Sequence, residues 1–206
     1  MGDFDFNHEQ LDALREIGNV GSGNAATALS QLLEKKISVD IPQVKLVSLE
    51  ELSNQQLLIN PEELSIAVSF KILGKLKGGV VVLYPQKSAL LLIDILSRRQ
   101  IGQTEVFNLE DESALNETAH IISCSYLNAV GQLINIYDLV PSLQDVSIDK
   151  KGTLSRVMLK RFVSDKVNFI LPIENNLAIE DLKLNLFVIF LLEQESIRNV
   201  FNKVGL

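Results

Sequence analysis

A weak internal repeat constrains the fold of this chain more than any other feature of its sequence. The segment that starts at Leu11, LDALREIGNVGSGNAATAL, is echoed from Glu112 by ESALNETAHIISCSYLNAV, with Glu16 aligned to Glu117. Similar apolar strands and an amphipathic closing segment follow each copy. A repeat of this kind indicates two similar units that bury their apolar surfaces against each other.

The order of predicted elements is the same in both halves. Strands are expected over 65–72 and 78–85 in the first half and over 167–174 and 185–192 in the second, each pair after a long helix and a further strand and before a last helix. This order predicts an α+β fold with pseudo-twofold symmetry. The helices are expected to pack on one shared, mainly antiparallel sheet of six strands.

The two repeats are expected to form one domain over 1–206. Their limits fall at about 8–100 and 109–206, with the polar stretch 98–112 between them. In the second repeat, apolar residues at helical spacing also predict a short helix over 149–163.

Charge and cysteine content exclude several classes of function. The formal net charge of −7 opposes binding to nucleic acid or to an anionic membrane and favours partners with basic patches. Cys124 is the only cysteine, and His8 and His120 are the only histidines, so neither a disulfide nor a zinc site of the usual kind is expected. The N-terminal segment lacks the pattern of a secretory signal and the apolar stretches are too short to cross a bilayer, which predicts a cytoplasmic protein.

Three polar residues lie on one face of the first predicted helix. Asp12, Glu16 and Asn19 are spaced four and three residues apart, while Leu14 and Ile17 supply apolar contacts on the other side. The row is a candidate site. Spacing alone favours a simpler interpretation, which is the solvated face of an amphipathic helix.

The run GSGNAA at 21–26 follows this row. It matches neither common phosphate-loop pattern, and no strand is predicted before it, so we interpret Gly21, Gly23 and Ala25 as a close contact between helices. In the second copy, Ser113, Glu117 and His120 lie on one predicted helix without a nucleophile-elbow motif. A serine-hydrolase triad is therefore rejected there, and His120 is interpreted first as a structural residue.

The residues around Asp12, Glu16 and Asn19 closely resemble the signature helix of the CheC/CheX/FliY phosphatase family. That family has an acid or serine, a glutamate four residues later and an asparagine three residues after that, followed by a run rich in glycine and alanine and by a strand after a proline, here Pro42. The second copy and the closing segment FVIFLLEQESIRNVFNKVG resemble the family as well, so the resemblance covers nearly the whole chain. Two complete repeats fit CheC-type members better than CheX.

The resemblance implies a chemotaxis phosphatase that hydrolyses the aspartyl phosphate of a phosphorylated CheY-type receiver domain. The receiver would supply its own Mg²⁺, and the chain would need no cofactor or metal of its own. Asn19 would orient the attacking water, Glu16 would pair with a lysine of the receiver, and Asp12 would support the helix. Phosphoryl hydrolysis needs little beyond such positioning and charge stabilisation.

The second copy departs from the family pattern because His120 occupies the asparagine position. We expect a second site that is weak or inactive, with Ser113 and Glu117 retained for docking, and the alternative is an active site in which His120 positions water. The family's other partner, the deamidase CheD, docks on an element near Asp149 to Phe162. Lys150 and Lys151 stand where the family more often has apolar and small residues, which argues against CheD binding.

Two other functions remain open from the sequence. The middle domain of the switch protein FliM shares the expected fold without the signature, which would make this chain a non-catalytic binding module. A slow adaptor that mainly modulates another partner is the third reading. Asn19 favours the enzyme over the binding module, and titration with a partner would test the slow adaptor.

Overall fold

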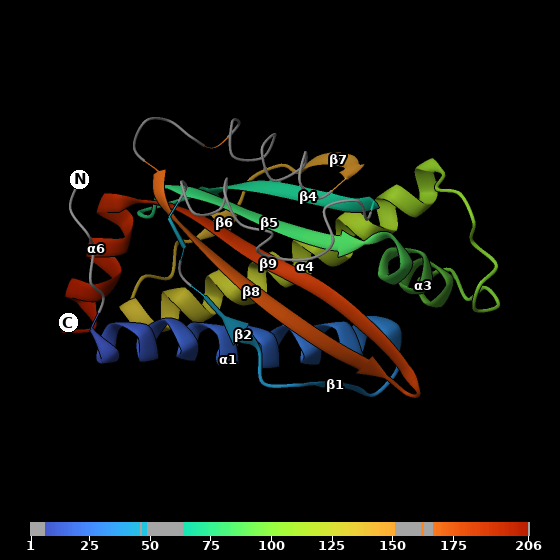
Figure 1. The fold of residues 1–206 in the computed structure, drawn as a ribbon, viewed down its shortest axis with the longest axis horizontal. Coiled ribbons are helices and arrows are strands. Elements are labelled where there is room, and N and C mark those ends of the chain that lie inside the picture. The colour runs from blue at the N-terminus through green and yellow to red at the C-terminus, as the bar shows by residue number, and fades with distance from the viewer. Residues whose placement is uncertain (1–6, 46, 49–63, 151–161, 163–166, 206) are drawn as a thin grey trace.

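Two long helices, α1 (His8–Leu33) and α4 (Leu109–Ile134), pack together on an antiparallel sheet (Figure 1). The computed structural model describes residues 7–45, 47–48, 64–150, 162 and 167–205. Figure 1 shows α1 and α4 running in opposite directions. Two shorter helices, α3 (Gln86–Leu96) and α6 (Gln194–Lys203), close the first and second repeats.

The ends of the long helices repeat the same chemistry at equivalent positions. Asn7 and Asn108 cap the N-termini of α1 and α4, each in a reciprocal capping box with the residue three positions later. Glu34 and Asn135 end the two helices in the left-handed conformation. Both pairs of caps are separated by the offset that aligns Glu16 with Glu117, so the structure keeps the register of the sequence repeat.

The described strands occupy six positions in one sheet. In chain order they are β1 (Ile37–Val39), β2 (Gln43–Val44), β3 (Val47–Ser48), β4 (Leu64–Leu73), β5 (Gly78–Pro85), β6 (Val140–Pro141), β7 (Asp145–Lys150), β8 (Val167–Ile179) and β9 (Leu182–Glu193). The order across the sheet is β1-β8-β9-β5-β4-β6, with β2 and β3 also paired to β8 and β7 also paired to β4. Every pairing is antiparallel.

The repeats exchange their outer strands. The strand segments that follow α1 pair with β8 of the second repeat, and those that follow α4 pair with β4 of the first. At the centre β5 pairs with β9, where Val81 lies opposite Ile189. The predicted α+β fold with pseudo-twofold symmetry and a shared antiparallel sheet is therefore confirmed, with some of the six sheet positions built from two or three short segments.

Close approach of the long helices depends on Gly21. A Cβ atom built there would lie 2.4 Å from Cδ1 of Tyr126 on α4, so no larger residue fits without movement of that ring. Ala25 is buried nearby. The prediction was wrong for Gly23, because that residue is exposed and nothing lies within 4 Å of a Cβ atom placed on it.

The short helix predicted over 149–163 is corrected at its start. Asp149 and Lys150 belong to β7 and pair with β4, because this segment completes the edge of the sheet. Residues 151–161 and 163 lie outside the described part of the chain. Phe162 is helical, and its ring packs over Gly79 of β5.

Among the described helices, none is long and apolar enough to span a membrane. The core lies between the long helices and the central strands. Alternate residues of those strands join the helices in one apolar cluster, among them Ile66, Val68, Phe70, Val80, Val82, Tyr84, Val188 and Phe190. Such alternation is what a strand with one face on the core produces.

Candidate functional site

The α1 row lies on the solvent side of the helix. Asp12, Glu16 and Asn19 are all exposed, while Leu14 and Ile17 on the other side are buried in the core. The fold thus places the three predicted residues of the first site on one face of α1 that is open to solvent.

Two further residues shape this surface. Arg15 Nη1 lies 2.7 Å from Asp12 Oδ1, with the two side chains 60% and 67% exposed. Gly23 stands one turn beyond Asn19 and leaves the surface there without a side chain. Sequence reasoning missed both roles: Arg15 was not considered, and Gly23 was assigned to packing. The helical spacing of Arg15 to both Asp12 and Asn19 was the available signal.

A buried hydrogen-bond network fixes α1 against α4 and the sheet. Ser22 Oγ lies 2.6 Å from Tyr126 Oη, and the Tyr126 hydroxyl donates to Asn175 Oδ1 at 2.6 Å. Ser22 also donates to Asn175, whose amide nitrogen donates to the carbonyl of Ile173 at 3.1 Å. Burial raises the pKa of the Tyr126 phenol to about 12, and this effect exceeds the opposing effect of its hydrogen bonds. The hydroxyl therefore stays protonated near neutral pH. The network therefore holds α1, next to its polar row, against both α4 and β8.

The second predicted site lies on α4. Ser113, Glu117 and His120 are exposed along one side of that helix. The ring centroid of His120 is 5.9 Å from that of Phe70, and its Nδ1 is 3.9 Å from Sγ of Cys124. The exposed imidazole therefore lies close to the side chains of Phe70 and Cys124.

The α1 row and the α4 row lie apart from each other. The helices cross where Gly21 meets Tyr126, and each row lies on the N-terminal side of that crossing in its own helix. Because the helices are antiparallel, Asn19 and His120 are displaced from each other by about 12 Å along the helix axes. The structure does not combine them into one constellation.

The surroundings of the two rows differ in charge. Arg15 is the only Lys or Arg between His8 and Leu33, and the sequence from Leu109 to Ile134 contains none. Asn116 stands where the repeat register places the counterpart of Arg15, and its Oδ1 is buried without a hydrogen-bond partner. The second copy therefore lacks both the amide and the cation of the first.

Neither row has the composition of a resident metal site. Among the described residues, no group of three or more His, Cys, Asp or Glu side chains could hold a metal ion. Burial, and then the nearby Glu117 carboxylate, raise the pKa of the Cys124 thiol above its ordinary value. This thiol is consequently a poor nucleophile near neutral pH.

Comparison with known sequences places the chain among chemotaxis proteins. A family model described as the CheC-like family matches residues 9–46, which contain the α1 row. The CheY-P phosphatase CheC of Bacillus subtilis (strain 168) is 35% identical over 154 residues, which are 71% of this chain and 69% of that protein. The flagellar motor switch phosphatase FliY of the same organism is 24% identical over 156 residues, 72% of this chain but 39% of that protein.

Solved structures show the same fold at low sequence identity. Thermotoga maritima FliY aligns with a TM-score of 0.78 and 19% identity over 98% of both chains. The FliM middle domain from H. pylori aligns with a TM-score of 0.66 and 14% identity, covering 96% of this chain and 99% of the other. These similarities concern the fold alone, whereas the sequence match to CheC extends over most of both proteins. The chain therefore belongs to the CheC-like family.

Proposed function

We propose that this protein is a CheC-type phosphatase that hydrolyses the aspartyl phosphate of a phosphorylated CheY-type receiver domain at a single site on α1. The homologous CheC is a CheY-P phosphatase by its name. The observation that carries the proposal is the exposure of Glu16 and Asn19 on one face of α1, inside the segment that the family model matches.

In this proposal Asn19 acts on the attacking water. Its amide both donates and accepts hydrogen bonds, and it carries no charge that would repel the phosphoryl oxygens. Phosphoryl transfer depends mainly on in-line positioning and on charge stabilisation, so an oriented water is a sufficient contribution from this side. The Mg²⁺ that neutralises developing charge would belong to the receiver.

Glu16, about one helical turn before Asn19, docks the receiver. An exposed carboxylate there pairs with a lysine of the receiver and fixes the register in which Asn19 meets the phosphate. Asp12 supports this surface through its ion pair with Arg15. The buried Ser22, Tyr126 and Asn175 network limits movement of the helix, which favours precise insertion.

The α4 row contributes little to hydrolysis in this proposal. The imidazole ring of His120 differs in geometry from the amide of an asparagine, and it lies close to Phe70 and Cys124. Glu117 and Ser113 are exposed and could still contact a receiver. The element that the resemblance connects with CheD falls mostly outside the described residues, so the expectation that this chain fits CheD poorly is not tested.

The test is dephosphorylation of a phosphorylated chemotaxis receiver with Mg²⁺ present. We expect Asn19→Ala to lose about a hundredfold or more in rate, as when one transition-state hydrogen-bonding group is removed, and His120→Ala to retain the wild-type rate. Asn24→Ala is the matched control, because this exposed asparagine of α1 points about 140° away from Asn19 around the helix.

Equal losses in Asn19→Ala and His120→Ala would instead make the second row functional. Absence of activity in the wild type with several receivers would contradict the enzyme and favour a non-catalytic binding module, which the similarity to the FliM fold makes the second candidate.

A further inference from the structure

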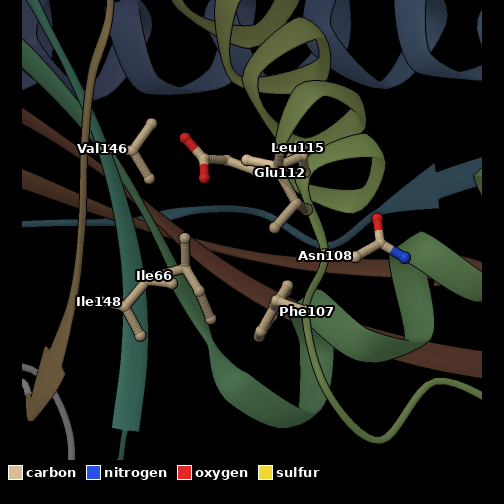
Figure 2. Close-up of a pocket in the computed structure, with 8 residues that line it drawn as sticks. Ile66, Phe107, Asn108, Glu112, Leu115, Val146 and Ile148 are labelled. Carbon is tan, nitrogen blue, oxygen red and sulfur yellow. The ribbon is translucent and has the colours of Figure 1, made fainter.

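A pocket of about 250 Å³ opens beside the start of α4 (Figure 2). Its lining is mainly apolar and comes from the segment before α4, from α4 itself and from the paired strands β4 and β7: Ile66, Phe107, Leu109, Leu115, Val146 and Ile148. None of these residues belongs to the α1 row. The pocket therefore lies outside the proposed phosphatase site.

The pocket combines a buried floor with an exposed apolar mouth. Ile66 and Leu115 are each 1% exposed and belong to the core. Leu109 is 84% exposed and Ile148 54% exposed. Exposed apolar side chains around a concave apolar site are typical of an interaction surface. A partner that covers them removes apolar surface from water, which is favourable.

The side of the pocket formed by residues 107–109 is held by a polar network. The Asp94 carboxylate accepts hydrogen bonds from the backbone of Gly102 at 2.6 Å and of Thr104 at 3.0 Å. Arg99 Nη1 lies 2.7 Å from Oδ1 of the fully buried Asp111 in the first turn of α4. The connector between α3 and α4 is therefore ordered before a partner binds, which lowers the entropic cost of forming a complex.

One residue at the rim of the pocket, Glu112, is acidic. Figure 2 shows the Glu112 carboxylate extending from α4 toward Val146, across one edge of the pocket. Glu110 and Glu117 are exposed on the same helix, which has no Lys or Arg. Among the described residues, Asp111 alone of the α4 acids has an ion-pair partner. The helix dipole accounts for acids in the first turn, but not for the apolar pocket beside Glu112.

The equivalent place on α1 is different. The repeat register puts His8 and Leu11 where α4 has Leu109 and Glu112. An exposed leucine beside an acidic residue is therefore not a requirement of the fold. It is a property that the second repeat has and the first lacks.

We propose that this pocket, with Glu112 at its rim, docks a protein segment that carries a bulky apolar side chain flanked by lysine or arginine. The apolar side chain enters between Leu109 and Ile148 and reaches the floor at Leu115. A flanking cation pairs with Glu112, the acid that lines the pocket, and the absence of Lys and Arg from α4 leaves nothing on that helix to repel the others. In this way the second repeat serves partner binding while the first serves hydrolysis.

The experiment uses the full chain labelled with ¹⁵N and three capped heptapeptides as probes. One has a phenylalanine between two pairs of lysines, the second has alanine in place of the phenylalanine, and the third has glutamate in place of the lysines. We expect the first to shift amide resonances at 107–115 and 146–148. The second should bind about tenfold or more weakly, which is the effect of losing one buried aromatic side chain, and the third should not bind.

Variants of the pocket test the location. Leu109→Lys places a cation at the mouth without disturbing the core and should weaken the first peptide about tenfold or more, and Glu112→Gln should weaken it most at low salt. Glu9→Gln, in the first turn of α1, is the matched control and should bind like the wild type. Retained dispersion of the spectrum reports that each variant is folded.

Three results would overturn the proposal: equal shifts with the phenylalanine and alanine peptides, equal weakening in Glu112→Gln and Glu9→Gln, or a concentration-dependent dimer that Leu109→Lys dissociates. The last would assign the pocket to a second copy of the chain. None of them depends on phosphatase activity, so failure here and failure of the proposed function are distinguishable.

Discussion

Arg15 stands one turn before Asn19 on α1 and is held toward the solvent by its ion pair with Asp12. An exposed pair of this kind adds at most about 1 kcal/mol to folding stability. In the proposed reaction its effect would be electrostatic, because it would place a cation one helical turn from the residue proposed to meet the phosphate, Asn19. The second copy has Asn116 at the equivalent position and therefore offers no such charge.

Replacement of this cation tests its contribution to the proposed reaction. We expect Arg15→Gln to lower kcat/KM for a phosphorylated receiver roughly fivefold, which corresponds to about 1 kcal/mol of transition-state stabilisation. Arg15→Lys should recover part of the loss, and raised salt should reduce the difference between the variants. Arg98→Gln is the control, since Arg98 is also exposed and paired with an acid, Glu34 at 3.7 Å. Equal losses in both glutamine variants would indicate a general charge effect.

The contact between the two long helices, α1 and α4, sets the positions of the α1 row and the α4 row. Tyr126 lies over Gly21 and joins Ser22 and Asn175 in the buried network. Gly23, two residues further along, faces open solvent. Two glycines in one helix thus experience opposite environments.

Alanine at each glycine should change stability in opposite directions. Gly21→Ala places a methyl group 2.4 Å from the ring of Tyr126 and should destabilise the fold by about 1–3 kcal/mol through overpacking. Gly23→Ala should stabilise it by about 0.5–1 kcal/mol, because alanine has the higher helix propensity and meets no neighbour. Urea unfolding followed by circular dichroism measures both. Stabilisation by Gly21→Ala would mean that the helices are not in contact there.

The sequence predicted the elements whose signals are local or repeated. The long helices, the central strands and the exposed row on α1 follow from periodicity and from the internal repeat. Periodicity could not separate Gly21 from Gly23, since both lie in one small-residue run and the crossing point depends on the partner helix. It also placed Asp149 in a helix, because the pairing of β7 with β4 is a long-range contact. The pocket beside Leu109 has no sequence signature, as it forms from three segments that are far apart in the sequence.

For the molecule as a whole, exchange of the edge strands means that neither repeat completes its share of the sheet alone. The strands after α1 need β8, and those after α4 need β4. The connector between the repeats must therefore guide α4 to its place. Asp94, at the end of α3, anchors that connector through Thr104 and Gly102.

Acid should weaken the molecule through this anchor. Burial raises the pKa of Asp94, but hydrogen bonds from the Thr104 side chain and from backbone N–H groups outweigh it, so the pKa lies below its ordinary value. A carboxyl group whose pKa is lower in the folded state stabilises the fold above its unfolded-state pKa near 4. That stabilisation is lost as the pH falls from there through the folded-state pKa.

The comparison of wild type with Asp94→Asn isolates this contribution. At pH 7 the variant should be less stable by about 1.5–3 kcal/mol, the value of hydrogen bonds to a buried charged group. Between about pH 4 and pH 2 the difference should shrink, because the wild type loses its carboxylate while the amide does not titrate. Urea midpoints measured across this range provide the test, with Asp138→Asn, an exposed acid, as the control. A stability difference that stays constant down to pH 2 would show that the connector is held by shape and not by the charge of Asp94.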